Sequence, residues 1–251
     1  IKTKLWMCSN CIKEDVGTYG ETYWHRVHQA PGVFLCPKHE TVLEETTISV
    51  KSENQHEYII ATPYLERSVY NLNGLGTEEK QQLLRIAQVT ESLLLNSHLQ
   101  TNANTLRNKY LVLLKQKEYA SLNGFVKRDR LFQSFRAKFS EECLNLLQSQ
   151  VTLDESNWLT MIFRKHRRSF HPLRHILILL FLETELSHLN KREQYDPFGQ
   201  GPWLCLNVAC ADYHEPIITS LAITICYDTK KPVGTFCCNC GFIFSRRGPD
   251  N

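Results

Sequence analysis

The first 39 residues contain two short pairs of residues of the kind that bind zinc. Cys8 and Cys11 form a C-x-x-C pair, and Cys36 and His39 form a C-x-x-H pair. A C-x-x-C turn supplies two thiolates from one backbone knuckle, and a second short pair completes the tetrahedral shell of a zinc ion. Because four protein ligands leave no open position for a substrate, this spacing predicts a structural site and not a catalytic one.

A second cysteine cluster lies near the end of the chain. Cys205 and Cys210 form one pair, and Cys237, Cys238 and Cys240 offer two alternative partners. Cys237 with Cys240 gives the common C-x-x-C knuckle, and Cys238 with Cys240 gives the tighter C-x-C, so spacing leaves both open. Between the pairs, IITSLAITICYDTKKPVGTF predicts two strands around a Lys-Pro turn. A hairpin that brings two knuckles together is a zinc ribbon.

Other interpretations of these clusters remain. Three histidines are alternative ligands, namely His25 and His28 between the first two pairs and His214 beside the second cluster. Disulfides are a further alternative. However, most of the ten cysteines lie in short pairs, and the sequence shows no signal peptide, a combination typical of intracellular metal sites. The sequence also begins at Ile1 and ends in RRGPDN, so we expect a piece of a longer polypeptide.

The residues between the two clusters have helical periodicity. GTEEKQQLLRIAQVTESLLLNS predicts a helix with Thr77 as its N-cap, and a second helix is expected from about Asn104 to Ala120. VKRDRLFQSFRAKF predicts a basic amphipathic helix, and Ser140 is placed to begin a short helix after it. Pro172 is placed in the first turn of a further apolar helix.

A basic corner precedes and enters that last helix. No acidic residue occurs from residue 164 to residue 175, whereas Phe170 and three histidines interleave five cations. The pattern favours a helix-turn-helix corner that meets DNA phosphates over a solvated charged face. The expected DNA-contacting residues are Arg164, Lys165, Arg167, Arg168, His171 and Arg174, with Arg246 and Arg247 beside the second cysteine cluster as a weaker pair.

Several classes of protein are disfavoured by the sequence. The formal charge of +3 is too small for a histone-like polycation, so anion binding requires local patches. The apolar run ILILLFL, from Ile176 to Leu182, is too short to span a bilayer. Nucleotide-binding loops, nucleophile elbows, H-E-x-x-H motifs and clustered acids are missing from the sequence. We therefore expect neither an enzyme nor a small-molecule substrate.

Longer patterns give a resemblance to a known family. C-x-x-C followed by GE-x-YWHRVHQ-x-PGV-x-x-CPKH resembles the zinc-finger segment of the TniQ family. WLTMIFRKHRRSFHPLRH, C-x-N-x-x-C and GTF-x-C-x-CGF-x-x-SRRGPD are similar to its longer TnsD branch. Members of this family are target selectors of cut-and-paste transposons, including CRISPR-associated relatives. They bind a chromosomal attachment site and recruit an AAA+ ATPase regulator, TnsC.

The resemblance implies a ligand set for each site. It implies Cys8, Cys11, Cys36 and His39 in the first site. In the second, it favours Cys205, Cys210, Cys238 and Cys240, because the family motif reads F-x-C-x-C-G-F.

The resulting expectation is a mainly α protein with two small zinc modules and a helix-turn-helix in the middle. The expected parts are a zinc finger over residues 1–45, a connection over 46–75, a helical region over 76–195 and a zinc ribbon over 196–251. Two Zn2+ ions per chain, double-stranded DNA and TnsC are the expected cofactors and partners. The expected location is cytoplasmic, at the nucleoid when bound to DNA. The alternative function is a zinc-stapled protein–protein adaptor without DNA readout.

Overall fold

The computed structural model describes residues 2–51, 54, 56–96, 103–154, 156–165, 169–190 and 195–249. The chain divides into two compact units. The N-terminal unit comprises Ile1–Arg107 and Phe132–Lys191, and the C-terminal unit comprises Asn108–Leu131 and Arg192–Asn251. The boundaries of these two units differ from the boundaries of the four predicted parts, which stay predictions.

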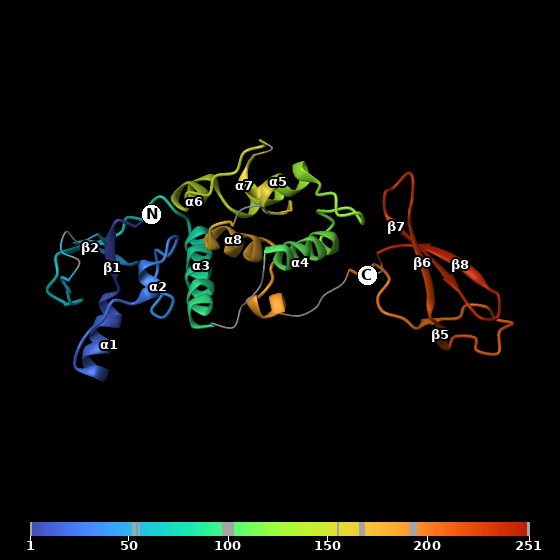
Figure 1. Ribbon diagram of the computed structural model, residues 1–251, viewed down its shortest axis with the longest axis horizontal. Coiled ribbons are helices and arrows are strands. Elements are labelled where there is room, and N and C mark those ends of the chain that lie inside the picture. Colours follow the sequence, from blue (N-terminus) through green and yellow to red (C-terminus); the bar gives the residue numbers. More distant parts are fainter. Residues whose placement is uncertain are drawn as a thin grey trace. The chain divides into compact units, whose positions relative to one another are not determined.

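A three-stranded antiparallel sheet opens the N-terminal unit (Figure 1). Its strands are β1 (Lys4–Met7), β2 (Glu44–Ser49) and β3 (Arg67–Val69), in the order β1-β2-β3. Helix α1 (Ser9–Tyr19) follows β1 directly, and the short helix α2 (Arg26–Gln29) packs against β1. β3 lies within residues 46–75, which were expected only to connect the zinc finger with the helical region. This segment therefore supplies the third strand of the sheet.

Aromatic rings fill the space beside this sheet. Trp6 meets Tyr70 at a ring-centroid distance of 4.9 Å and Phe34 at 5.8 Å. The ammonium group of Lys2 lies 4.1 Å from the Trp6 ring and donates hydrogen bonds to the backbone carbonyls of His28 and Val33. These contacts tie the start of the chain to α2 and to the loop between α2 and Cys36, because the His28 carbonyl belongs to the helix and the Val33 carbonyl to the loop.

The helices of the N-terminal unit are built around α3 (Thr77–Leu95) and α8 (Pro172–Phe181), which pack against each other (Figure 1). Around them lie α6 (Glu141–Leu146), α7 (Trp158–Met161), a 3-10 turn, η1 (Leu186–Asn190), and α5 (Arg128–Lys138), whose residues up to Leu131 belong to the C-terminal unit. Phe135 is fully buried, and its ring lies between 5.0 and 5.7 Å from the rings of Phe139, Phe181 and Trp158. This aromatic cluster joins α5, α7 and α8.

The predicted helix starts are confirmed in two cases and corrected in one. The Ser140 hydroxyl accepts a hydrogen bond from the Cys143 backbone N–H at 3.2 Å, as expected of an N-cap. Pro172 is the first residue of α8, and the preceding His171 caps it through its imidazole. By contrast, Thr77 is the first helical residue of α3 and Gly76 takes the cap position, so Thr77 is not the cap.

The end of α4 (Ala103–Gln116) also differs from the expectation of a helix up to Ala120. Glu118 adopts a left-handed conformation with φ of 58°. The backbone N–H groups of Tyr119 and Ala120 then both donate to the carbonyl of Leu114, at 2.7 and 3.1 Å. Such bonds satisfy the last helical carbonyls and terminate a helix, so α4 ends one turn early.

The C-terminal unit contains the predicted hairpin and an additional strand. β6 (Ser220–Ile225), β7 (Pro232–Cys237) and β8 (Ile243–Arg247) form an antiparallel sheet with β7 in the centre. β4 (Trp203–Leu204) pairs with β5 (Pro216–Ile218) in a separate two-stranded sheet. The two-strand prediction is confirmed, and β4, β5 and β8 were not expected.

Phe236 on β7 is the centre of this unit's core. It is fully buried and contacts the rings of Phe198, Trp203 and Phe244 at 4.9–5.6 Å. Phe198 approaches so closely that a Cβ atom at Gly234 would lie 2.9 Å from its ring, which explains the glycine there.

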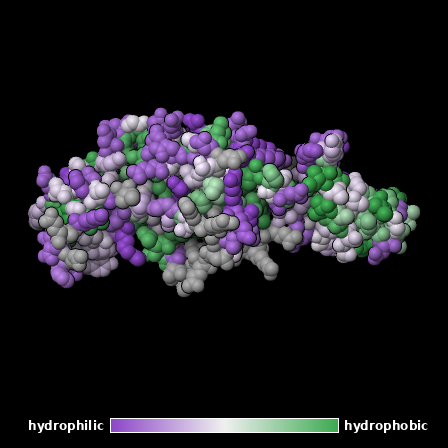
Figure 2. Space-filling model, turned by 45° about the horizontal axis from the view of Figure 1, so that its top comes forward, coloured by the Kyte–Doolittle hydropathy of each residue, from purple (hydrophilic) through white to green (hydrophobic). Residues whose placement is uncertain are grey.

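The alternating isoleucines of β6 are covered only in part. Ile223 and Ile225, on the edge strand β6, keep 45% and 40% of their surface exposed. Figure 2 shows hydrophobic surface at this end of the chain. Among the described residues, no helix has both the length and the apolar composition needed to cross a membrane.

Candidate metal centres and basic surface

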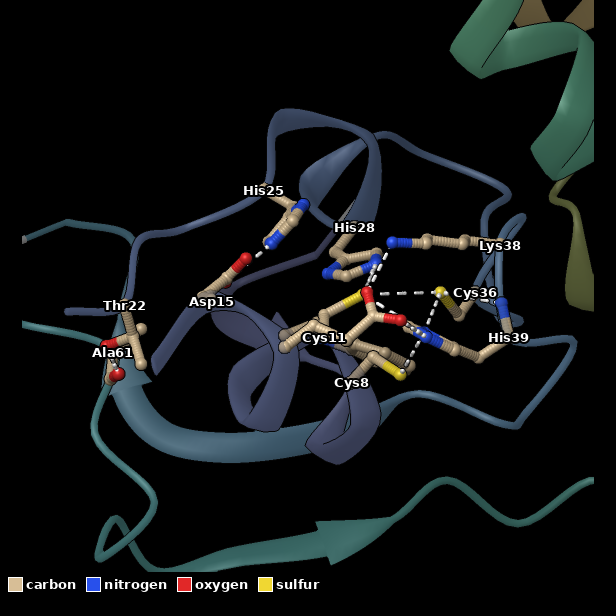
Figure 3. Close-up of polar contacts among 12 residues, drawn as sticks. Cys8, Cys11, Asp15, Thr22, His25, His28, Cys36, Lys38, His39 and Ala61 are labelled. Carbon is tan, nitrogen blue, oxygen red and sulfur yellow. Dashed lines mark hydrogen bonds and ion pairs between the residues drawn. The ribbon is translucent and has the colours of Figure 1, made fainter. Parts of the chain in front are cut away.

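The two N-terminal pairs converge on one point in space. The Sγ atoms of Cys8, Cys11 and Cys36 and a ring nitrogen of His39 all lie within 4.8 Å of one another (Figure 3). His39 Nδ1 is 3.6, 3.3 and 3.6 Å from the sulfurs of Cys8, Cys11 and Cys36, and the Cys11 and Cys36 sulfurs are 3.6 Å apart. None of the ten cysteines, all of which lie in the described part of the chain, forms a disulfide.

These separations match a tetrahedral metal shell. Bonds of about 2.3 Å to sulfur and 2.0–2.1 Å to nitrogen place tetrahedral ligands roughly 3.5–3.8 Å apart. All three cysteines are at least 97% buried, so the centre is closed to solvent on the sulfur side. Hydrogen bonds from Cys36 and Cys8, followed by burial, raise the pKa of the Cys11 thiol above its ordinary value. A bound cation would offset the free energy needed to ionise this thiol, because metal ligation deprotonates thiols.

Two local structures position the four ligands. Cys8 occupies the N-cap position of α1, and Cys11 lies in its first turn. The second pair sits in a tight turn, in which Cys36 N–H donates to the Thr41 carbonyl at 2.8 Å and Glu40 N–H donates to the Cys36 carbonyl at 2.9 Å. The site therefore depends on a helix start and a turn that are separated by 25 residues from Cys11 to Cys36.

A carboxylate that the sequence analysis did not single out completes the first site. Glu14 accepts a hydrogen bond from His39 Nε2 at 3.0 Å and also pairs with Lys38. Lys38 and His39 together hold the pKa of the Glu14 carboxyl below its ordinary value. With Nε2 donating to Glu14, Nδ1 is left to face the sulfurs. The signal for Glu14 was its position three residues after Cys11, which on a helix places both residues on one face.

The alternative histidine ligands lie outside the cluster. His25 Nε2 is 2.9 Å from the buried carboxylate of Asp15, and His28 Nε2 is 3.9 Å from the Cys11 sulfur (Figure 3). Burial lowers the pKa of His28 to about 3, so its ring is neutral at physiological pH. His214 is not in the second cluster and contacts the Tyr213 ring instead.

The second cluster comprises Cys205, Cys210, Cys238 and Cys240, whose sulfurs lie within 4.8 Å of one another. Cys205 and Cys238 are buried, whereas Cys240 is exposed. Hydrogen bonds from the Asn207 side chain and from the backbone at Phe242 lower the pKa of Cys240 to about 6. The lowered pKa favours the thiolate form that a metal ligand requires.

Strand register explains why Cys238 joins this cluster and Cys237 does not. Cys237 is the last residue of β7, paired with Ser220 on β6 and Ile243 on β8. The chain then turns, with Cys238 N–H donating to the Phe242 carbonyl at 2.9 Å and Gly241 N–H donating to the Cys238 carbonyl at 3.0 Å. Because side chains alternate along a strand, Cys237 points away from the face of Phe236.

The described part of the basic corner borders an open cavity of about 800 Å³. Lys165 and Arg174 line it, and the Arg174 guanidinium lies 5.4 Å from the centre of the Trp158 ring. His171 Nδ1 accepts the Leu173 backbone N–H at 3.2 Å, so this histidine is committed to capping α8. Burial, then the charge of Arg174, lowers the pKa of His171.

The remaining candidate DNA contacts are more dispersed. Arg164 is exposed, and its guanidinium contacts the Met161 sulfur at 3.8 Å. Arg167 and Arg168 lie outside the described residues. On β8, the Arg246 guanidinium lies 4.6 Å from the centre of the Phe236 ring, and Arg247 is exposed.

Sequence comparison identifies the family. Residues 86–251, which include α8 and the whole C-terminal cysteine cluster, match the family described as "TnsD: Tn7-like transposition protein D". The chain belongs to this family. It is also 25% identical over 191 residues to "Transposon Tn7 transposition protein TnsD" of Escherichia coli, which covers 74% of this chain. The chain spans 36% of that relative's length.

Proposed function

We propose that each of the two clusters holds one Zn2+ ion and that both sites are structural. The support is the match between the spacing of the ligand atoms and a tetrahedral shell with no free position. When bound, the zinc supplies folding free energy that a small module cannot obtain from apolar burial alone. In the first site Glu14 orients His39, since a carboxylate on the far ring nitrogen fixes the tautomer of a ligating histidine.

Replacing Glu14 by glutamine is expected to weaken zinc binding at the first site by about tenfold, the lower end of the range for such outer partners. The amide carries no charge to strengthen the bond from His39. Competition with a zinc chelator measures the change. Lys38→Gln is the matched control, because it removes the other partner of Glu14 and leaves the bond to His39. Equal affinities for Glu14→Gln and the native chain would contradict the role of Glu14.

We further propose that the chain is the DNA-binding part of a transposon target selector that recruits the regulator TnsC and has no catalytic activity of its own. The observation that carries this proposal is the family match, which includes the basic corner within its 166 residues from 86 to 251. Lys165 and Arg174, with Arg164 beside them, form a cationic surface suited to phosphates. The helix-turn-helix, the attachment site and the location at the nucleoid are parts of the same proposal.

Loss of basic-corner residues is expected to weaken DNA binding in two distinguishable ways. Arg164→Ala and Lys165→Ala should each reduce the slope of log affinity against log salt by about one on any duplex. Arg174→Ala should cost roughly 1–3 kcal/mol on a duplex copied from the chromosomal flank of the transposon and little on random DNA, if Arg174 reads a base. Arg167 and Arg168 are expected to behave as Arg164 does.

The measurement is fluorescence anisotropy over a salt series. Arg85→Ala, on the exposed face of α3, serves as the control. If the affinity and slope of every corner variant equal those of the control, the corner is a solvated face. The adaptor without DNA readout would then be the better proposal.

A further inference from the structure

A second cationic cavity lies within the C-terminal unit, and none of the residues predicted to contact DNA is among its described lining residues. Its volume is about 240 Å³. Five cationic side chains line it: Lys115, Lys127, Arg130, Lys230 and Lys231. Individually none of these residues belongs to a recognisable motif, and Lys230 and Lys231 were interpreted only as a turn.

Three separate segments bring these charges together. Lys115 lies in the last turn of α4, whereas Lys127 directly precedes α5 and Arg130 lies in its first turn. Lys230 and Lys231 form the tip of the β6–β7 hairpin. That tip is held by two backbone bonds, from Lys230 N–H to the Cys226 carbonyl at 3.0 Å and from Cys226 N–H to the Lys231 carbonyl at 2.9 Å.

The charge in the lining is strongly unbalanced. Glu118 is the one carboxylate among the described lining residues, and it is already paired with Arg130 at 3.2 Å. The four lysines therefore have no carboxylate partner within the lining. Clustered like charges repel one another, so a cavity of this kind is stabilised by an anion.

Hydroxyl groups add directional donors. Ser121 and Thr229 line the cavity, and the Ser121 oxygen already accepts the Phe125 backbone N–H at 3.1 Å, which leaves its O–H to donate. Tyr195 is the third hydroxyl. Burial, then the charge of Glu118, raises the pKa of Tyr195, so the phenol stays protonated and can donate.

We propose that this cavity binds a phosphate group through Lys115, Lys127 and Lys231, and that the phosphate belongs to the DNA backbone. Compact ammonium groups with hydroxyl donors suit the tetrahedral, charged oxygens of a phosphate. The choice of DNA as the source rests on the proposed function. A free nucleotide presents the same chemistry and is the alternative source.

The test compares two triple variants that lose the same charge. One is Lys115→Gln with Lys127→Gln and Lys231→Gln. The control is Lys13→Gln with Lys51→Gln and Lys80→Gln, which removes three lysines that do not line the cavity. Binding of a random-sequence duplex is measured by anisotropy over a salt series, and binding of ATP and of inorganic phosphate by calorimetry. A third variant, in which arginine replaces the three cavity lysines, keeps the charge. Together with the zinc content of each variant, it controls for misfolding.

The cavity triple is expected to reduce the salt slope for duplex binding by about two to three, and the control by less than one. Equal reductions in the two triples would show a long-range charge effect and overturn the proposal. Binding of ATP or phosphate that depends on the cavity, without duplex binding by the native chain, would keep the phosphate site and reject the DNA function. Duplex binding that is unaffected in the cavity triple, with no phosphate binding, would reject the site and leave the proposed function intact.

Discussion

Replacement of Cys36 by serine is expected to remove one of two zinc ions and to unfold the N-terminal module. Cys36 is fully buried and its sulfur lies 3.6 Å from both the Cys11 sulfur and His39 Nδ1. A structural zinc site contributes on the order of ten kcal/mol of apparent binding free energy at neutral pH, and this energy stabilises the fold. That amount is comparable with the whole stability of a typical domain. The variant should therefore lose ordered structure around β1, α1 and the turn at Cys36.

Metal analysis and amide exchange measure the two parts of this result. The native chain should contain two zinc ions, and Cys36→Ser should contain one. Cys226→Ser is the matched control, since Cys226 belongs to neither cluster. A Cys36→Ser protein that stays folded and keeps two ions would show that the ligand set of the first site is wrong.

The second large effect is expected from a pair of adjacent cysteines. Cys238→Ala should lower the zinc content from two to one, whereas Cys237→Ala should leave it at two. Cys238 is 6% exposed and its sulfur lies in the cluster, while Cys237 ends the β7 ladder. Because the two variants differ by one position and remove the same group, each serves as the control for the other.

Metal analysis of both variants, with thermal unfolding of the ribbon, checks this prediction. Cys238→Ala should also lower the midpoint of thermal unfolding, because the knuckle after β7 would lose its anchor. The opposite pattern of zinc contents would favour the ordinary C-x-x-C knuckle of Cys237 and Cys240 and would contradict the strand register.

The family match is consistent with the structural role that we propose for both zinc sites. Neither cluster has an open position, so function is expected on the surfaces that the sites hold in place. In the C-terminal unit the hairpin between Cys210 and Cys238 carries at its tip two of the four lysines that line the proposed phosphate cavity. Loss of the second zinc is therefore expected to disturb that cavity as well.

The sequence by itself determined the features that depend on residues close together in the chain. The C-x-x-C and C-x-x-H pairs predicted the first ligand set, whose atoms the structure brings within 4.8 Å of one another, because one turn of backbone brings such pairs to a common point. Ser140 and Pro172 marked helix starts correctly, because capping depends on the first turn alone. For the second site, spacing left Cys237 and Cys238 open, and the family resemblance favoured the residue that the geometry places in the cluster.

Tertiary structure decided the features that depend on residues far apart in the chain. The early end of α4 follows from a left-handed Glu118, a conformation that helix propensity does not predict. The bond from His39 to Glu14 joins a turn to a helix across 25 positions. The proposed phosphate cavity gathers lysines from α4, the residue before α5 and a hairpin tip. Each of these charges resembles an ordinary surface residue in the sequence, because only the folded chain fixes the distances on which their electrostatic interaction depends.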